Sequence, residues 1–364
     1  MAADSEKYAV ASQRQLIWWR FKRHKLAIIS LWVVALFYVF ALSADFLATS
    51  DPHATDSRTS YIAPQPIHWF DNGTFGPYVN GLKGVRDIKT FKLIYTIDPT
   101  RKLPIEFFGH GYKYSFLGFE TDRHLLAVNN AQRGEGIYLL GTDLLGRDLW
   151  SRLAVATRVS LTIGLVGVTI SLFLGVLLGG ISAVYGGLVD GFIQRSIEVI
   201  RSMPAIPLWL GLSAALPNDW SVTQVYFAIT IIISLLTWTD LARVVRGKFL
   251  ALREEDFVLA AELAGASQLR IVFHHLLPSF TSHIIAAVSL ALPAMIISET
   301  SLSFLGLGLR PPAISWGILL QDAQNIQTLA LAPWLLFSAI PVVLVILAFN
   351  FLGDGLRDAA DPYG

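Results

Sequence analysis

Long uncharged apolar runs recur along the chain and are separated by shorter polar segments. A helix needs about 20 apolar residues to cross roughly 30 Å of hydrocarbon, and six runs approach or exceed that length. The six predicted spans are residues 26–44, 159–189, 202–218, 222–239, 276–298 and 333–353. Three of them contain prolines, which a membrane helix tolerates when its neighbours satisfy the freed backbone groups. The pattern therefore predicts an all-α polytopic membrane protein with six transmembrane helices.

The first run has a second interpretation. It follows the basic, aromatic stretch "RQLIWWRFKRHK", which suits the cytoplasmic interface of a span. The letters "ALSA" before Asp45 resemble a cleavage site, so a removed signal peptide is the alternative. The run is longer than the apolar region of most signal peptides. This length favours a retained first span.

The segment from residue 46 to residue 150 differs in character from the apolar runs. It is rich in proline, glycine, aspartate and aromatic residues. The stretch "DIKTFKLIYTI", residues 87–97, alternates between polar and apolar positions as a strand does. We therefore expect a large loop outside the membrane that contains some β structure.

Lys and Arg gather on one set of loops, which fixes the predicted orientation. Cytoplasmic loops carry an excess of these residues, whereas long loops cross the membrane regardless of charge. An even number of spans puts both termini on one side. We expect both termini and residues 241–276 to be cytoplasmic and residues 46–150 to be extracytoplasmic. The residues that support this are Arg14, Arg20, Lys22, Arg23, Lys25, Arg195, Arg201, Arg243, Arg246, Lys248, Arg253 and Arg270.

Composition supports a membrane protein and removes several classes of site. Hydrophobic residues make up 54% of the chain and charged residues 15%. In soluble domains, apolar residues make up about 45–50% and charged residues about a quarter. The net charge of +1 gives no ground for a nucleic-acid partner. The chain has no cysteine, which excludes disulfides, thiolate metal sites and a cysteine nucleophile. Membrane lipid is the expected surrounding.

The stretch "DFVLAAELAGASQLRIVFHHLLP", Asp256 to Pro278, interrupts the apolar pattern. Its letters predict two short helices, with Gly265 as a left-handed stop and Ser267 as the N-cap of the second helix. Small side chains would let another surface approach closely. The residues alone leave two interpretations open, a docking element for a soluble partner or an ordinary connecting loop.

Four stretches resemble one family. "AAELAGAS" followed by "HHLLP" resembles the EAA motif of ABC-importer permeases, although Leu259 and His275 depart from it. "LLGTDLLGRDLWSRL", "ETSLSFLGLGLRPPAISWG" and "AFNFLGDGLRDAADP" are similar to signatures of the oligopeptide/dipeptide/nickel branch. Together they cover nearly everything from about residue 139 to residue 364, whereas residues 46–138 carry no such resemblance.

The resemblance implies a transmembrane permease subunit of an ATP-driven, binding-protein-dependent importer in the bacterial inner membrane. Peptides are the expected substrates, and oligosaccharides or nickel are the alternatives. The implied partners are a second homologous permease, two cytoplasmic ATPase subunits and an extracytoplasmic substrate-binding protein. The chain itself would be a non-catalytic subunit without a cofactor, because the partner ATPases would bind ATP and magnesium.

The sequence agrees that the energy for transport must come from a partner subunit or an ion gradient. It has no G-x-x-x-x-G-K-[ST] phosphate loop, because Ala242 and Phe249 stand around Gly247-Lys248 where glycine and Ser or Thr would be required. A secondary transporter driven by an ion gradient is the alternative class. Such proteins often contain internal repeats, and none is visible in this sequence.

The resemblance also assigns an organisation. It implies a cytoplasmic N-terminal segment (1–25), a first span (26–45), an extracytoplasmic loop (46–150), a permease core (151–353) with a coupling loop (241–276), and a cytoplasmic tail (354–364). The residues expected to couple to the ATPase are Asp256, Ala260, Ala261, Glu262, Gly265, Ala266, Ser267, His275 and Pro278.

Ionisable residues near spans are costly in lipid and are candidates for function. Glu299 and the neighbouring Ser303 are candidates for lining the translocation pathway, with structural pairing as the alternative for Glu299. Glu198 and Asp240 are expected to lie near cytoplasmic helix ends. Their expected partners are Arg195, Arg201 and Arg243. The adjacent His274 and His275 face different sides of a helix and do not form a chelating pair.

The stretch "GTDLLGRD" offers two carboxylates, Asp143 and Asp148, together with two glycines. A calcium loop is the alternative, but the EF-hand spacing is absent. We expect Asp143 to cap a turn that leads into a helix, and Asp148 to pair with Arg147 or Arg152.

Overall fold

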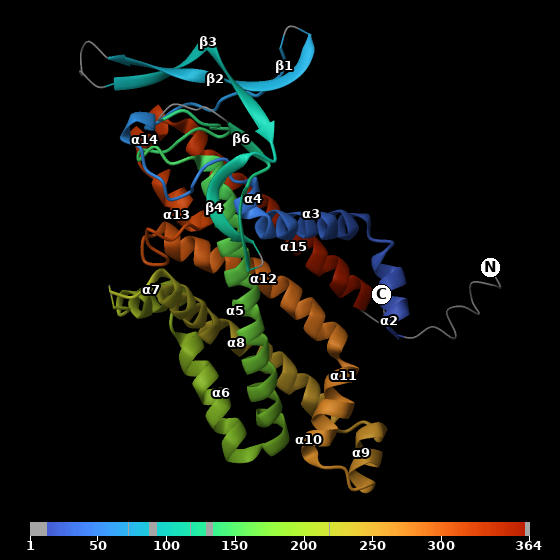
Figure 1. The fold of residues 1–364 in the computed structure, drawn as a ribbon. Coiled ribbons are helices and arrows are strands. Elements are labelled where there is room, and N and C mark those ends of the chain that lie inside the picture. The colour runs from blue at the N-terminus through green and yellow to red at the C-terminus, as the bar shows by residue number, and fades with distance from the viewer. Residues whose placement is uncertain are drawn as a thin grey trace, which may run out of the picture. The chain divides into compact units, whose positions relative to one another are not determined.

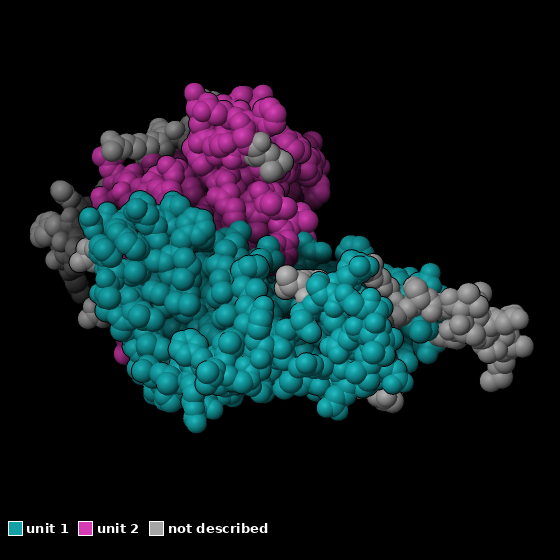
Figure 2. All heavy atoms as spheres, turned by 90° about the horizontal axis from the view of Figure 1, so that it is seen from below, with its two compact units in different colours: residues 1–35, 162–302, 344–364 teal, residues 36–161, 303–343 magenta. Residues whose placement is uncertain are grey.

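The computed structural model describes residues 13–71, 73–86, 93–116, 118–128, 134–217 and 219–360. The chain forms two compact units, which Figure 2 shows in different colours. Unit 1 contains residues 1–35, 162–302 and 344–364, and unit 2 contains residues 36–161 and 303–343.

Helices make up most of the described chain (Figure 1). The longer helices are α2 (Gln13–Phe21), α3 (Lys25–Leu42), α5 (Leu149–Tyr185), α6 (Gly187–Ser202), α7 (Ala205–Ala214), α8 (Val222–Leu252), α9 (Asp256–Leu263), α12 (Thr281–Phe304) and α15 (Ala339–Ala360). The shorter ones are α4 (Ala44–Leu47), α10 (Gln268–Arg270), α11 (Leu277–Ser279), α13 (Trp316–Asp322), α14 (Ile326–Leu331), the 3₁₀ turns η1 (Ser57–Thr59) and η3 (Pro333–Ser338), and the π-helical turn η2 (Ile271–Leu276).

Five helical stretches in the described residues are long and apolar enough to cross a membrane. They are Lys25–Leu42, Leu149–Tyr185, Val222–Leu252, Ile284–Phe304 and Pro333–Ala359. The remaining predicted span, 202–218, differs from the expectation because its helix α7 has only 10 residues. Met203 and Pro204 are extended and separate α6 from α7, since a residue before proline avoids the helical region.

Glycines on α5 allow close packing inside unit 1. A Cβ on Gly167 would lie 2.9 Å from the Met295 side chain of α12, and one on Gly179 would lie 3.0 Å from Cα of Ala242 on α8. At Gly167 itself, Ser234 Oγ of α8 donates to the backbone carbonyl oxygen at 3.1 Å. Small residues let membrane helices approach until their backbones touch. Helix α5 is therefore the surface on which α8 and α12 pack.

A second contact joins α5, α6 and α8 beyond this glycine face. The Arg246 guanidinium donates from Nε and Nη2 to the two carboxylate oxygens of Asp190, both at 2.6 Å. Ser182 on α5 also donates to Asp190. The Arg246 guanidinium holds the pKa of Asp190 below its usual value. The bidentate geometry fixes the turn between α5 and α6 against α8.

Strands occupy the segment between the first and second of the five candidate spans, in unit 2. They are β1 (His68–Asp71), β2 (Thr74–Arg86), β3 (Leu93–Phe107), β4 (His110–Phe116), β5 (Phe119–Arg123) and β6 (Leu126–Val128). One antiparallel sheet has the order β1-β2-β3-β6, and β4 pairs with β5. Of the expected strand 87–97, residues 93–97 lie in β3, and residues 87–92 lie outside the described residues.

Alternating side chains give the larger sheet one buried face. Val79 of β2, Leu103 and Ile105 of β3, and Ile137 form a buried cluster. Leu82 pairs with Ile97 across β2 and β3 in register, and it packs in a second small cluster with Ile62. The strands are thus held by a hydrophobic core of their own.

The glycine face of α5 generates a first prediction. Gly179→Leu forces a side chain against the Ala242 backbone, and we expect it to reduce the stability of the folded chain by about 1–3 kcal/mol, the usual cost of overpacking. Thermal unfolding of the purified protein in detergent measures the effect. Gly191→Leu on α6 is the matched control, because nothing lies within 4 Å of a Cβ at that position. Equal unfolding temperatures for the two variants would contradict the packing described above.

Candidate functional site

The segment after α8 contains the residues expected to couple to a partner. Residues 241–252 of the predicted loop belong to α8, so the segment proper begins after Leu252. Helix α9 starts with Asp256 in its first turn. It stops at Gly265, whose φ of +79° confirms the predicted left-handed position. Gly265 N donates to Glu262 O at 2.9 Å, and Ala266 N donates to Ala261 O at 3.0 Å, as in a glycine C-cap.

The second helix of the segment begins as predicted. Ser267 Oγ accepts a hydrogen bond from Arg270 N at 3.4 Å, which confirms its N-cap role. The helical path continues through α10, η2 and α11, and it breaks at Phe280 before α12. Pro278 is the middle residue of α11.

A buried apolar cluster supports this helical pair. Val258 of α9, Ile271 of η2 and Phe249 of α8 are almost fully buried together with Phe280. The rings of Phe249 and Phe280 meet edge to face, with centroids 5.3 Å apart. Ala261 also packs against this cluster, as does Ala266. The base of the segment is therefore fixed to the end of α8 by side-chain packing.

The opposite face of the segment is open. Leu263 has 91% of its surface exposed, and Leu259 one turn earlier is also exposed. Residues four apart lie on one side of a helix, so the two leucines form an apolar strip. Sequence reasoning missed Leu263, although its spacing from Leu259 is a readable signal. Among the expected coupling residues, Asp256, Ala260, Gly265, Ser267 and Pro278 are exposed, whereas Ala261, Glu262, Ala266 and His275 are half-buried.

The two pathway candidates are closed off within the chain. Glu299 and Ser303 both have no exposed surface. Ser303 Oγ accepts a hydrogen bond from Leu309 N at 3.1 Å, so it holds the turn after α12. Their place in a pathway stays a prediction.

The expected ion pairs are confirmed, although Asp240 lies inside α8 and not near its end. Arg195 Nη1 lies 2.7 Å from Glu198 Oε2 on α6, and Arg201 pairs with Asp240 of α8. Within the residues that the structure describes, no group of three or more His, Asp or Glu side chains is placed to hold a metal ion.

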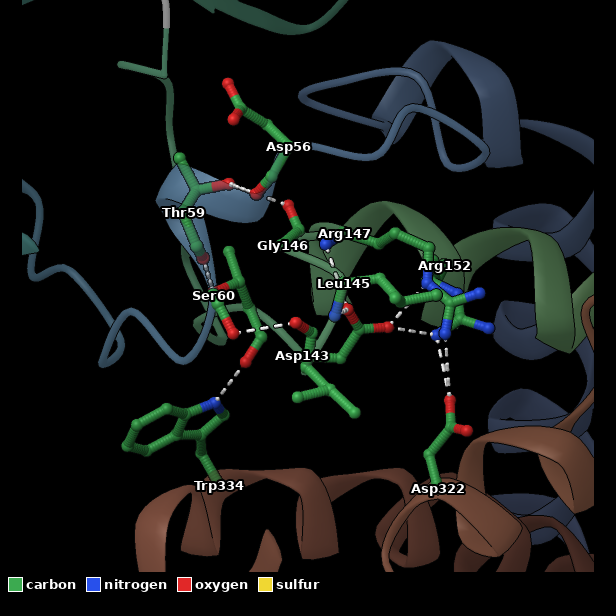
Figure 3. A network of polar contacts seen from close by, with 12 residues as sticks. Asp56, Thr59, Ser60, Asp143, Leu145, Gly146, Arg147, Arg152, Asp322 and Trp334 are labelled. Atoms are coloured by element: carbon green, nitrogen blue, oxygen red, sulfur yellow. Dashed lines mark hydrogen bonds and ion pairs between the residues drawn. The ribbon is translucent and has the colours of Figure 1, made fainter. Parts of the chain in front are cut away.

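The "GTDLLGRD" stretch forms a buried network of hydrogen bonds and ion pairs in unit 2 (Figure 3). We call this network around Asp143 and Arg152 the polar knot. Asp143 Oδ2 accepts from Arg147 Nε at 2.7 Å and from Arg152 Nη1 at 2.5 Å. Arg152 has 1% of its side-chain surface exposed, and its Nη1 also donates to Asp322 Oδ2 of α13 at 3.0 Å. Asp143 Oδ1 accepts from the backbone N–H of Leu145 and of Arg147.

The prediction that Asp143 caps the turn is confirmed by the bonds from Leu145 N and Arg147 N, whereas the prediction that Asp148 pairs with Arg147 or Arg152 was wrong. Asp143 forms the ion pairs, and Asp148 caps the helix. Asp148 Oδ2 accepts from Ser151 N at 2.8 Å, the third residue of α5, and from Ser151 Oγ. Asp148 directly precedes α5, which is the position that an N-cap requires. Burial raises the pKa of Asp148 to about 6, and the bonds from Ser151 partly offset this.

Gly146 and Trp334 complete the polar knot. Gly146 has a φ of +73°, and a Cβ there would collide with Asp56 O. Thr59 Oγ1 donates to Gly146 O at 3.0 Å. Trp334 Nε1 donates to Thr142 O at 3.0 Å (Figure 3). The knot therefore joins three parts of unit 2 that are distant in sequence.

Two family models match the chain. Binding-protein-dependent transport system inner membrane component matches residues 171–363, and N-terminal TM domain of oligopeptide transport permease C matches residues 12–64. The chain belongs to the binding-protein-dependent inner membrane component family. This family identity makes it a multi-pass inner-membrane component of a transport system, and it confirms the resemblance drawn from the sequence motifs.

Curated relatives agree with the family. The oligopeptide transport system permease protein OppC of Haemophilus influenzae is 38% identical over 68% of this chain and 77% of its own length. The dipeptide transport system permease protein DppC of Lactococcus lactis subsp. cremoris is 32% identical over 95% and 89%. A solved structure of the MetNI methionine ABC transporter, in inward-facing conformations, is similar with a TM-score of 0.46 and 18% identity, over 57% of this chain and 96% of that chain.

The knot generates a second prediction. Arg152→Gln leaves Asp143 buried without its closest cation, and removal of one partner of a buried pair costs about 3–5 kcal/mol. We expect a large drop in the unfolding temperature in detergent. Lys102→Gln, which breaks the exposed pair with Asp71 in the same unit, should have little effect. Unchanged stability of the Arg152 variant would show that the knot does not hold unit 2 together.

Proposed function

We propose that the chain is the permease subunit of an ATP-driven, binding-protein-dependent importer of peptides. The family match over residues 171–363 is the observation that carries the proposal. The relatives described above, at 38% and 32% identity, are permeases for oligopeptides and dipeptides, which favours peptides over oligosaccharides or nickel. The proposed assembly contains a second homologous permease, two cytoplasmic ATPases and an extracytoplasmic binding protein.

The proposed topology has six crossings. The five long apolar helices supply five of them, and the C-terminal part of α6 followed by α7 supplies the third as a broken helix. Broken helices are tolerated at membrane depth where they line a cavity or lie inside protein. Both termini and the segment 253–280 then lie in the cytoplasm, and the strands of unit 2 lie outside.

The proposed coupling site is the exposed face of α9 and the Gly265 turn. Leu259, Ala260 and Leu263 offer an apolar surface next to a turn without a side chain. Exposed leucines outside the membrane favour a protein partner. The buried base at Val258 and Phe249 transmits a push on this face to α8. The ATPases bind ATP and magnesium, and this chain is non-catalytic.

Uptake of a labelled peptide tests the proposal. We expect proteoliposomes with both permeases, the ATPases and the binding protein to accumulate labelled tri-alanine only with ATP inside the compartment that holds the ATPases. Dissipation of the proton gradient should leave the uptake unchanged. Uptake that survives without ATP and disappears with the gradient would identify a secondary transporter instead.

The coupling face generates its own prediction. Leu263→Glu places a charge on the apolar strip, so we expect loss of ATPase co-purification and of uptake, while the amount of chain in the membrane stays normal. Leu188→Glu is the matched control, since Leu188 is 95% exposed and starts α6 on the same proposed side. Equal co-purification with both variants would exclude α9 as the docking helix.

A further inference from the structure

A polar pocket lies in unit 1 between the end of α6, the start of α7 and α8. It contains about 690 Å³ of empty space, part of it open to solvent. We call it the α6–α8 pocket. Its lining includes the Arg201–Asp240 ion pair together with Met203, Trp209 and Thr237.

The charged residues of the pocket lie beside the uncharged stretch of α5, where charges are rare. Leu241, the residue after Asp240, packs against Gly175 of α5, where an added Cβ would lie 2.8 Å from Leu241 Cβ. Gly175 stands close to midway between Arg158 and Asp190, the charged residues that bracket the uncharged stretch of α5. The ion pair therefore lies beside the uncharged stretch of α5, at the cytoplasmic ends of the predicted spans 202–218 and 222–239. Charged side chains at that level face the bundle interior or a water-filled cavity.

The ion pair is accessible within the chain. Asp240 has 73% of its side-chain surface exposed and Arg201 has 41%. Lipid would be a costly environment for both groups. The exposed side of the pocket must therefore face either an aqueous pathway or the sister permease.

Two polar atoms of the pocket have capacity for a ligand. Asp240 pairs with Arg201 through Oδ1, and Oδ2 is the second acceptor oxygen of the same carboxylate. Trp209 Nε1 is buried and has no acceptor among the described residues. A buried donor without a partner carries a free-energy cost of about 1–3 kcal/mol, which a bound acceptor would remove.

The chemistry of these atoms matches the end of a peptide. A permease that accepts many peptides can rely only on features that all of them share, the terminal charges and the main chain. A carboxylate oxygen receives an ammonium group in a charge-assisted hydrogen bond. An indole N–H can donate to the adjacent peptide carbonyl.

We propose that the α6–α8 pocket binds the N-terminal end of the peptide in transit. Asp240 accepts from the α-ammonium while Arg201 orients the carboxylate, and Trp209 donates to the first peptide carbonyl. This inference rests on the proposed peptide import. It assigns to unit 1 a binding site for the main chain and not for the side chains of the substrate.

The absence of cysteine in the chain allows a direct test. A single Met203→Cys variant places a reporter in the pocket, and Ile231→Cys on α8 is the control with similar exposure, 47% against 49%. Both are assembled with the cysteine-free partners in proteoliposomes and treated with a water-soluble maleimide. We expect Met203→Cys to react faster than Ile231→Cys, and tri-alanine to slow this reaction.

The ammonium contact is tested in the same system. N-acetylated tri-alanine should protect the reporter much less than tri-alanine. Asp240→Asn on the Met203→Cys background should raise the protecting concentration of tri-alanine about tenfold, as expected for loss of one charge-assisted hydrogen bond, and Asp240→Glu should restore it. These comparisons use the labelling rate, so they do not depend on the selectivity of the binding protein for uptake.

Three results would overturn the inference. Equal protection by both peptides would exclude recognition of the ammonium. No protection, in a complex that still accumulates tri-alanine, would exclude the pocket as a peptide site. A reporter that stays unreactive in a complex with normal uptake would show that the sister permease covers the pocket. Failure of ATP-driven uptake by the unmodified complex would instead refute the proposed function itself.

Discussion

Close approach of helix backbones along α5 is the contact on which unit 1 depends. In lipid, apolar side chains gain little free energy by exchanging contacts with lipid tails for contacts with another helix. Helices therefore associate through tight packing and hydrogen bonds. The glycines of α5 supply both, because they admit Met295 and the backbone of Ala242 and leave a carbonyl open to Ser234. The same contacts set the depth at which Asp240 lies, so helix packing and the placement of charge have one origin.

Local features could be predicted from the sequence, and the structure confirms them. The stop at Gly265 and the cap at Ser267 depend on residues within one helical turn, so a short stretch of letters contains all the information. The pairing of Arg201 with Asp240 was among the expected ones. The family motifs extended the prediction from local structure to the family of the chain, and the family match confirms that resemblance.

The predictions that failed concern the residue at which a helix starts and contacts between residues that are distant in sequence. Both Asp143 and Asp148 precede α5, and the choice of cap depends on the residue at which the helix starts, which the apolar run did not reveal. Asp322 is 170 residues from Arg152, so no local pattern could join them. The break at Met203 and Pro204 was hidden because an apolar composition predicts a span whether or not the helix is continuous.

The arrangement of the knot around Arg152 has a consequence for the order of synthesis. Arg152 contacts Asp143, nine residues upstream, and Asp322, 170 residues downstream. A ribosome that has just completed the N-terminal turn of α5 has already made the first carboxylate, whereas the second emerges only after most of the remaining chain has been translated. The nearby aspartate can therefore act as an early counter-ion during membrane insertion, and the distant one closes the pair when the last helices arrive. The two carboxylates around Arg152 thus become available at two different times during synthesis.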